Sequence, residues 1–343
     1  MKKLVKNSYF QFLLLALALL LIVPLASLGI IPSSIVVNIA TVIIYGIAAL
    51  GLNILLGFSG LISLGTAGFM GLGAYLSAYF TYQMNLPFEV SLILSILIPT
   101  LIGILIGFVS LKIEGLYLAI ATLAVAEVFR EIFIQFDFFT GGSSGAKAAY
   151  PKLFFGLLDL SKQPIVARSV TYCLIVFVLL VILFLSFNLL KGYIGRSFNA
   201  MRGSEHAAQA MGINILRYRI IAFAIATAFA ALAGVLYVHI IRISYPTTWN
   251  MNLSLDMLAI IVIGGFRSLY GTFVGSFVVY GMSEIFLKKI DGISEYAYII
   301  KGVLIILVIL FYPGGIMQLF RDIRQKIRQL FKKDKEVIHE PVR

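Results

Sequence analysis

Residues that could carry catalysis or bind a metal are few and scattered in this chain. Its three histidines, His206, His239 and His339, lie far apart, and no H-E-x-x-H spacing occurs. The single cysteine, Cys173, sits inside an apolar run, and a lone thiol can neither form an intrachain disulfide nor make a good metal site. No G-x-x-x-x-G-K-S/T loop is present to cradle nucleotide phosphates. The sequence therefore predicts a protein that is not an enzyme, with no metal site and no nucleotide site of its own.

Three charged residues interrupt an otherwise apolar segment, residues 116–131. A charge inside a membrane-spanning helix costs roughly 2.5–3.5 kcal/mol on insertion scales, so it normally faces protein or water. On a helix, Glu127, Arg130 and Glu131 share one face, and Arg130 can bridge either acid. Two interpretations stay open: an ion pair that faces the helix bundle near its outer end, or a wall or gate of a transport pathway. Proton coupling is disfavoured because the adjacent arginine would keep both acids ionised.

The composition is that of a membrane protein. Of the 343 residues, 61% are hydrophobic and 12% are charged, and the mean hydropathy is +1.02. Soluble domains are roughly 45–50% apolar and about 25% charged. The net charge of +12 does not indicate nucleic-acid binding, because the lysines and arginines fall between the long apolar runs rather than on one polar domain. The positive-inside rule explains that distribution.

Apolar runs of about 20 residues, the length needed to cross a bilayer, recur along the chain. They predict an all-α, polytopic transmembrane helical bundle with about ten spans, at roughly 9–31, 34–56, 61–83, 88–110, 115–138, 169–190, 217–241, 253–266, 270–287 and 295–312. With the N-terminus in the cytoplasm, most lysines and arginines fall on the inner side, so both termini are expected there. Residues 1–320 form the predicted transmembrane domain. Residues 321–343 form a basic cytoplasmic tail, either an amphipathic helix on the inner leaflet or a solvated segment.

Glycines are dense in two segments that would otherwise be ordinary membrane helix, residues 51–74 and residues 264–275. Small residues at this spacing suit close helix packing. Alternatively the helix is interrupted, and its freed backbone groups line a cavity. Both segments follow a span that ends at the cytoplasmic side and open a span that runs outward, which favours a translocation pathway. The residues expected to line it from these segments are Asn53, Ser59, Ser63, Thr66, Gly264 and Gly265.

A long loop on the outer side begins with four small or polar residues. Loops of this length are usually functional or mobile. We therefore expect an extracytoplasmic protein to dock here, on Thr140, Gly141, Gly142 and Ser143.

On the inner side, residues 195–214 form a polar insert between two spans. Ser204 can cap a short helix, and Gly212 would end it. A capped helix outside the membrane offers a surface on which another protein can dock. The alternative is an ordinary loop held against the lipid surface.

Taken in order, these blocks resemble the permease family of branched-chain amino acid ABC importers, in particular its LivM-type members. The resemblance covers nearly the whole chain beyond residue 35. The matching stretches are residues 51–60 (GLNILLGFSG), 115–122 (GLYLAIAT), 140–143 (TGGS), 205–208 (EHAA), 212–214 (GIN), 264–265 (GG) with Gly271, and 312–316 (YPGGI). Each stretch alone is a weak signal, whereas the ordered set is specific.

The resemblance implies a membrane subunit of an ATP-driven importer that carries leucine, isoleucine and valine across a bacterial or archaeal plasma membrane. Its implied partners are a second related permease, two ATP-binding cassette subunits that hold the ATP, and an extracytoplasmic amino-acid binding protein. No cofactor is expected in the chain itself. The insert, at about residues 203–213, looks like the coupling helix that docks on the ATPase. The residues expected at that contact are Arg202, Ser204, Glu205, His206, Ala207, Ala208 and Gly212; Tyr117, Thr122 and Glu127 join the predicted pathway.

Two departures from the family pattern leave the substrate open. Thr66 stands where many relatives carry a histidine, and Ser144-Gly145 replaces a frequent Asp-Gly pair. Related permeases carry urea or short amides, which the chain does not exclude. An ion-coupled secondary transporter is the alternative from another class. It would need Glu127 and Glu131 as coupling groups and would not need a coupling helix.

Overall fold

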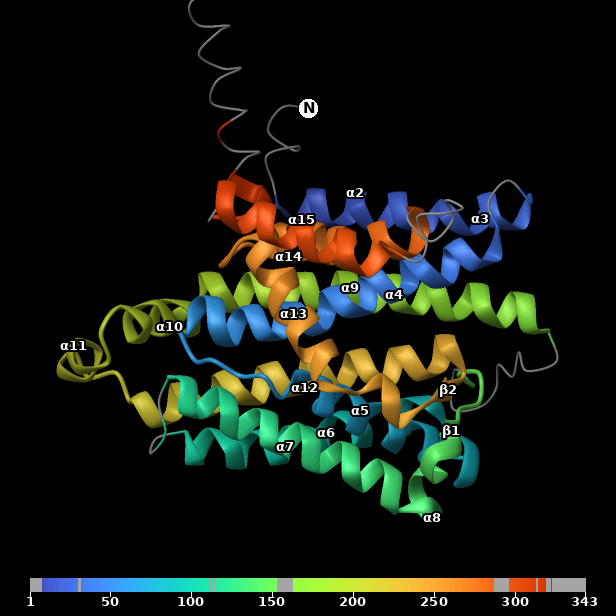
Figure 1. Ribbon diagram of the computed structural model, residues 1–343, viewed down its shortest axis with the longest axis horizontal. Helices are drawn as coiled ribbons and strands as arrows, with labels where there is room; N and C mark the ends of the chain where they lie inside the picture. Colours follow the sequence, from blue (N-terminus) through green and yellow to red (C-terminus); the bar gives the residue numbers. More distant parts are fainter. Residues whose placement is uncertain are drawn as a thin grey trace, which may run out of the picture.

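The computed structural model describes residues 8–29, 32–110, 113, 115–152, 163–286, 296–312, 314–318 and 322. Within these ranges the chain is almost entirely helical and has one pair of two-residue strands. The long helices lie side by side along the longest axis of the molecule (Figure 1). The predicted all-α class is therefore confirmed. The predicted tail, 321–343, lies outside the described residues apart from Asp322.

Five helical stretches are long and apolar enough to cross a membrane. They are α2 (Ser8–Leu20) with α3 (Ile22–Ser27), α4 (Ser33–Leu52) with the π-helix η1 (Asn53–Phe58), α6 (Phe88–Val109), α9 (Pro164–Lys191) and α12 (Ile215–Ile241). The other predicted spans coincide with shorter or more charged elements: α5 (Thr66–Ala78) with η2 (Tyr79–Gln83), α7 (Leu116–Gln135), α13 (Met251–Gly264), α14 (Leu269–Ser276) with η5 (Phe277–Phe286), and α15 (Ala297–Phe311). The helical membrane protein is confirmed, and the count of ten spans stays a prediction.

The remaining elements are short and lie at the two ends of the bundle. At one end, which we call the insert end, α10 (Tyr193–Gly203) and α11 (Glu205–Ala210) connect α9 to α12 (Figure 1, left). The opposite end is the loop end (Figure 1, right). It contains α8 (Asp137–Thr140), the 3-10 turns η3 (Gly142–Ser144) and η4 (Pro246–Thr248), and the antiparallel strands β1 (Ala146–Lys147) and β2 (Ile243–Ser244).

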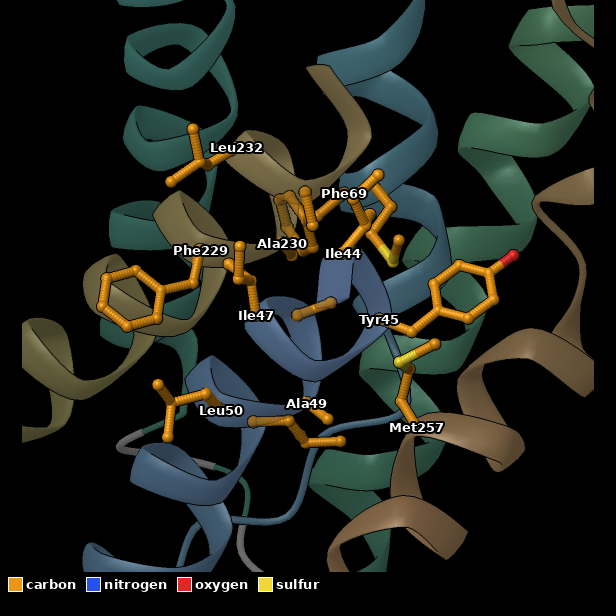
Figure 2. Packing of buried hydrophobic residues seen from close by; sticks show 14 of the residues in the cluster. Ile44, Tyr45, Ile47, Ala49, Leu50, Phe69, Phe229, Ala230, Leu232 and Met257 are labelled. Carbon is orange, nitrogen blue, oxygen red and sulfur yellow. The ribbon is translucent and has the colours of Figure 1, made fainter. Parts of the chain in front are cut away.

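Helices α4 and α12 form the centre of the bundle. Of their most apolar stretches, 78% and 67% of the residues are buried, against 11% for α2, 22% for α6 and 33% for α9. Figure 2 shows Ile47 and Leu50 of α4 in one cluster with Phe229 and Ala230 of α12. A helix that is apolar on all sides belongs in such a core. These two helices therefore fix the positions of the irregular segments that follow or precede them.

Glycines let α5 and α12 approach each other closely. Gly73 of α5 lies against the backbone of Ala231, and Gly234 of α12 lies against the carbonyl oxygen of Met70. A β-carbon at either glycine would overlap these backbone atoms. Close packing, one of the two interpretations of the glycine-rich segment, is therefore confirmed where α5 crosses α12.

Candidate functional site

The first glycine-rich segment is also an interrupted helix. Helix α4 passes into η1, and residues 60–65 then run without helix or strand until α5 begins at Thr66. Gly60 has a φ of +81°, a conformation that residues with a β-carbon rarely adopt. Irregular backbone at membrane depth is tolerated only where protein buries it or where it lines a cavity. The partners of its backbone groups therefore determine what this break can do.

Side chains from two other helices accept two of the backbone amides at the break and the start of α5. The amide of Leu64 donates to Thr122 Oγ1 of α7 at 2.9 Å. The amide of Ala67 donates to Ser254 Oγ of α13 at 3.1 Å. Thr122, predicted to line the pathway, thus supports the broken backbone from a neighbouring helix. The break is held in a defined conformation rather than left open.

The serines and the threonine predicted for the pathway in this segment are also buried within the subunit. The hydroxyl of Ser59 donates to the carbonyl oxygen of Leu55, and the hydroxyl of Ser63 accepts the amide of Gly65 at 3.3 Å. Ser63 and Thr66 line a cavity of about 10 Å³, which holds roughly one water and is too small for an amino acid. Within the described part of this subunit, the first break therefore encloses no route of substrate size.

The second glycine-rich segment is a sharp turn between α13 and α14. Gly265 has a φ of +102°, and Arg267 has a φ of +64°. Ser268 caps α14 by accepting the amide of Gly271 at 2.9 Å. A β-carbon at Gly264 would overlap the carbonyl oxygen of Gly271, so these glycines allow the two helices to meet at the turn. The predicted pathway residues Gly264 and Gly265 thus shape the backbone of a second break.

Asn53, fully buried at the start of η1, joins the two breaks. Its Nδ2 donates to Thr272 Oγ1 at 2.8 Å and to the carbonyl oxygen of Ser268 at 3.3 Å. Its Oδ1 accepts the amide of Arg267, 214 residues further along the chain, at 3.1 Å. A single side chain therefore satisfies a donor and two acceptors of the α13–α14 turn. Any displacement of η1 must carry that turn with it or break these bonds.

The polar insert folds into the short capped helix predicted from the sequence. The hydroxyl of Ser204 accepts the amide of Ala207 at 3.3 Å at the start of α11. Gly212, with a φ of +81°, closes the other end in the left-handed conformation typical of a helix C-terminus. Of the residues predicted for the ATPase contact, Arg202, Ser204, His206, Ala207 and Gly212 are exposed, Glu205 is half-buried and Ala208 is buried.

An ion pair fastens α11 to the first turns of α12. Arg219 Nη2 lies 2.5 Å from Glu205 Oε2, and a second nitrogen of the same guanidinium donates to the carbonyl oxygen of Ser110 after α6. The side chain of Arg219 is only 4% exposed, whereas that of Glu205 is 35% exposed. The short helix is therefore anchored to two of the long helices of the bundle, α6 and α12.

Loss of Glu205 and loss of Arg219 should destabilise the protein to different extents. Breaking a buried pair by deleting one partner costs about 3–5 kcal/mol when the remaining charge stays buried. Glu205→Ala leaves the buried Arg219 charge with fewer partners, whereas Arg219→Met leaves a carboxylate that can turn toward water. Thermal unfolding in detergent should therefore give a lower midpoint for Glu205→Ala than for Arg219→Met. The opposite order would show that the arginine matters chiefly through other contacts.

Two arginines connect the insert to both breaks. Arg202, in the last turn of α10, donates to the carbonyl oxygen of Gly57 in η1. Arg267, in the α13–α14 turn, donates to Asn199 Oδ1 of α10 at 2.7 Å. With the bonds of Asn53, these contacts form a closed set of hydrogen bonds that we call the break–insert network: Asn53, Gly57, Asn199, Arg202 and Arg267. The network links the insert physically to the two irregular segments of the bundle.

Helix α7 carries its three charges on the surface of the subunit. Arg130 Nε donates to Glu127 Oε1 at 2.7 Å, and Arg130 Nη2 donates to Glu131 Oε1 at 3.1 Å. The side chains are 28% exposed for Arg130, 48% for Glu127 and 54% for Glu131. The predicted pairing is therefore confirmed, but the group faces away from the bundle of this chain. Tyr117, another predicted pathway residue, lies on the same helix and is 78% exposed.

At the loop end, two of the four residues predicted to dock an outer protein build the turn itself. Thr140 is fully buried; its hydroxyl donates to the carbonyl oxygen of Phe133 at 2.7 Å and accepts the amide of Gly142 at 3.1 Å. Gly142 is also buried. Gly141 and Ser143 are exposed, and they are the two of the four that could touch a partner.

Several residues that join these segments carry no direct signal in the sequence. They are Asn199, Arg219, Ser254 and Thr272, and each of them bonds to a residue that is distant along the chain. Arg267 and Ser268 offer a usable signal, because polar residues that closely follow a Gly-Gly pair in an apolar segment mark a helix break.

A helical membrane bundle with an interrupted helix and a glycine-rich turn, both tied to a polar insert at one end, has the features of a membrane transport protein. The family model described as "Branched-chain amino acid transport system / permease component" matches residues 34–309. The chain therefore belongs to the branched-chain amino acid transport permease family.

Individual relatives agree with this family. The high-affinity branched-chain amino acid transport system permease protein LivM of Salmonella typhimurium is 30% identical over 289 residues, which cover 79% of this chain and 67% of the relative. The probable branched-chain amino acid transport permease protein LivM of Methanocaldococcus jannaschii is 26% identical over 66% of this chain and 68% of its own length. The ribose import permease protein RbsC of Bacillus subtilis is 28% identical over 56% and 58%, respectively. No solved structure matches the chain.

Proposed function

We propose that this chain is the membrane-spanning permease subunit of an ATP-driven importer and that it translocates branched-chain amino acids delivered by an extracytoplasmic binding protein. The family and the LivM relatives support this substrate class. The complex further contains a second related permease and two ATP-binding cassette subunits, which hold the ATP. The insert end and both termini face the cytoplasm, and the loop end faces the binding protein.

The break–insert network is the observation that carries this proposal. Helix α11 exposes His206 and Ala207 to solvent, and beside it lies an open hollow of about 520 Å³ lined in part by His206, Gln209 and Arg219. An ATPase subunit that docks here holds the insert from outside the membrane. From the insert, Asn199 and Arg202 reach both helix breaks. An ion-coupled secondary transporter binds no ATPase subunit, so it does not need an exposed helix that is linked to both breaks.

The geometry supports alternating access driven from the insert. When the two ATPase subunits close on ATP, they move α10 and α11. The ion pair between Glu205 and Arg219 carries that movement to α6 and α12. The network carries it to η1 and to the α13–α14 turn, whose glycines leave few side chains to repack. Packed helices shift between discrete arrangements rather than deforming continuously, so two states of the route result.

Uptake of labelled leucine into proteoliposomes that hold the complex from the native host tests the proposal. We expect uptake to require ATP on the insert side and binding protein on the loop side. Unlabelled isoleucine and valine should compete, and urea and acetamide should not. Leucine uptake that follows an ion gradient without ATP would contradict the proposal. Competition by urea or acetamide would show that the substrate belongs to the amide class.

A bulky side chain on the outer face of α11 should uncouple the importer. In Ala207→Trp the indole projects from an exposed position, so it blocks a docked ATPase without disturbing the packing of the bundle. We expect ATP-dependent leucine uptake to fall to background while the permease remains in the membrane at wild-type amounts. Ala207→Ser, which keeps the side chain small, serves as the matched control and should transport normally. Wild-type uptake by Ala207→Trp would show that α11 does not contact the ATPase.

A further inference from the structure

The outer faces of α6 and α7, two helices consecutive in the chain, differ in kind. Every exposed residue of α6 is apolar: Ile93, Leu97, Leu101, Leu105, Phe108 and Val109. This is the surface that lipid requires. On α7 the exposed residues are Leu116, Tyr117, Ile120, Ala124, Glu127, Val128, Glu131 and Gln135. Helix α7 lies at the edge of the bundle opposite α2 and α15 (Figure 1), so its outer face is not covered by those elements.

The exposed residues of α7 follow a helical repeat and change in character along it. Residues 120, 124, 127, 128, 131 and 135 recur every three or four positions, so they form one stripe. The stripe is apolar near the start of α7, and beyond the middle of the helix every member except Val128 is acidic or polar. A stripe that faces lipid stays apolar through the hydrocarbon core and becomes polar only near the interface, whereas Glu127 lies eight residues before the last residue of α7, about 12 Å along the helix axis.

The ionic group in this stripe is half-exposed and not neutral. Glu127 and Glu131 share the single guanidinium of Arg130, so the group carries a net charge of −1. Charged groups inside a membrane face protein or water rather than hydrocarbon. The side that faces outward from this chain must therefore meet a protein surface or the water enclosed with it.

A second copy of this chain is a poor occupant for the stripe. Two copies related by a twofold axis would bring two groups of charge −1 together in a medium of low dielectric constant, where like charges repel strongly. A different protein that presents a cation or hydrogen-bond donors matches the two carboxylates better.

We infer that the stripe of α7 is the surface through which this subunit packs against the second, non-identical permease, whose facing helix presents a cation or hydrogen-bond donors to Glu127 and Glu131. This inference rests on the proposed function, because it identifies the occupant as the partner permease of the importer. It explains why, in the described part of the chain, the polar residues of the first break line a cavity of only about 10 Å³: the route lies between the two permeases rather than within this one.

Photo-crosslinking in membranes of the native host, with the whole complex present, tests this inference. The photoreactive residue p-benzoylphenylalanine replaces Val128 of α7 or, as the matched control, Leu97 of α6; both positions lie near the middle of their helices and are about half exposed, at 57% and 49%. We expect illumination to join the Val128 position to the second permease, identified by mass spectrometry, and the Leu97 position to lipid alone. Lipid adducts alone at both positions, or a conjugate of two copies of this chain, would overturn the inference.

A charge reversal tests the chemistry of the contact independently. Glu131→Lys turns the net charge of the group from −1 to +1, and we expect the recovery of the second permease with this chain to be lost. Leu101→Lys on α6 places the same side chain on the lipid-facing surface, and the partner should still be recovered with it. Undiminished recovery with Glu131→Lys would overturn the inference while leaving the importer intact. Failure to recover any second permease with the unaltered chain would instead overturn the proposed function.

Discussion

An Asn53→Leu variant is expected to insert into the membrane and assemble with its partners, yet to lose most ATP-dependent uptake. Leucine has a similar volume but can make none of the three hydrogen bonds that tie η1 to the α13–α14 turn. The amide of Arg267 loses its acceptor, and an unsatisfied buried donor costs about 1–3 kcal/mol. Movement of the insert would then no longer carry both breaks together. The measurement is leucine uptake and ATP hydrolysis by the same proteoliposomes, and we expect hydrolysis to continue while uptake falls.

Asn38→Leu provides the matched control for this experiment. It is the same substitution in the same helical stretch, formed by α4 and η1, and Asn38 Nδ2 donates one long bond, at 3.5 Å, to the carbonyl oxygen of Glu284. Transport by this variant should stay close to that of the wild type. If Asn53→Leu transports equally well, the bonds between the two breaks do not serve transport.

A Gly234→Val variant is expected to fail at the level of folding. Helix α12 is one of the two central helices, and a β-carbon at Gly234 would overlap the carbonyl oxygen of Met70 in α5. The neighbouring atom is backbone, so the whole helix must move, and overpacking of this kind costs about 1–3 kcal/mol or more. We expect a lower midpoint of thermal unfolding in detergent and less folded protein in the membrane.

Gly302→Val separates the overlap from the intrinsic effect of valine in a helix. Gly302 lies within α15, and no described residue comes within 4 Å of the position of its β-carbon. Its unfolding midpoint should remain near that of the wild type. Equal losses from both variants would show that the α5–α12 crossing tolerates a side chain.

The sequence predicts the local features of the insert well. A serine before a helix-forming stretch and a glycine after it specify a short helix by hydrogen bonds that lie within a few residues of each other. Ser204 and Gly212 take those positions in the structure. Each glycine-rich segment suits either close helix packing or a break, and the first one contains both: Gly73 lies against the α12 backbone, and residues 60–65 have no helix or strand.

The sequence does not predict which polar groups serve those breaks. Each freed amide in an apolar medium needs a partner, and Thr122 and Asn53 supply such partners from positions that become neighbours only after the helices pack. From the sequence, each of these residues is a polar residue in a membrane helix. Such a residue could equally line a transport pathway or bond to the backbone of a neighbouring segment.

For a related reason, the sequence does not predict in which direction the charged face of α7 points. Helical spacing shows that Glu127, Arg130 and Glu131 share a face. It does not show whether that face turns inward, because the rest of α7 offers apolar residues on every side. Packing decides the direction: Thr122 and Phe133 turn into the bundle, and the charges turn out.

Mass spectrometry of the proteins that co-purify with the tagged chain from its native host, in mild detergent, tests the central claim most directly. We expect a second permease and an ATP-binding cassette subunit in amounts comparable to the chain itself. We further expect Ala207→Trp to retain the permease and lose the ATP-binding subunit. Recovery of this chain alone, stably folded and able to move leucine without ATP, would contradict the claim.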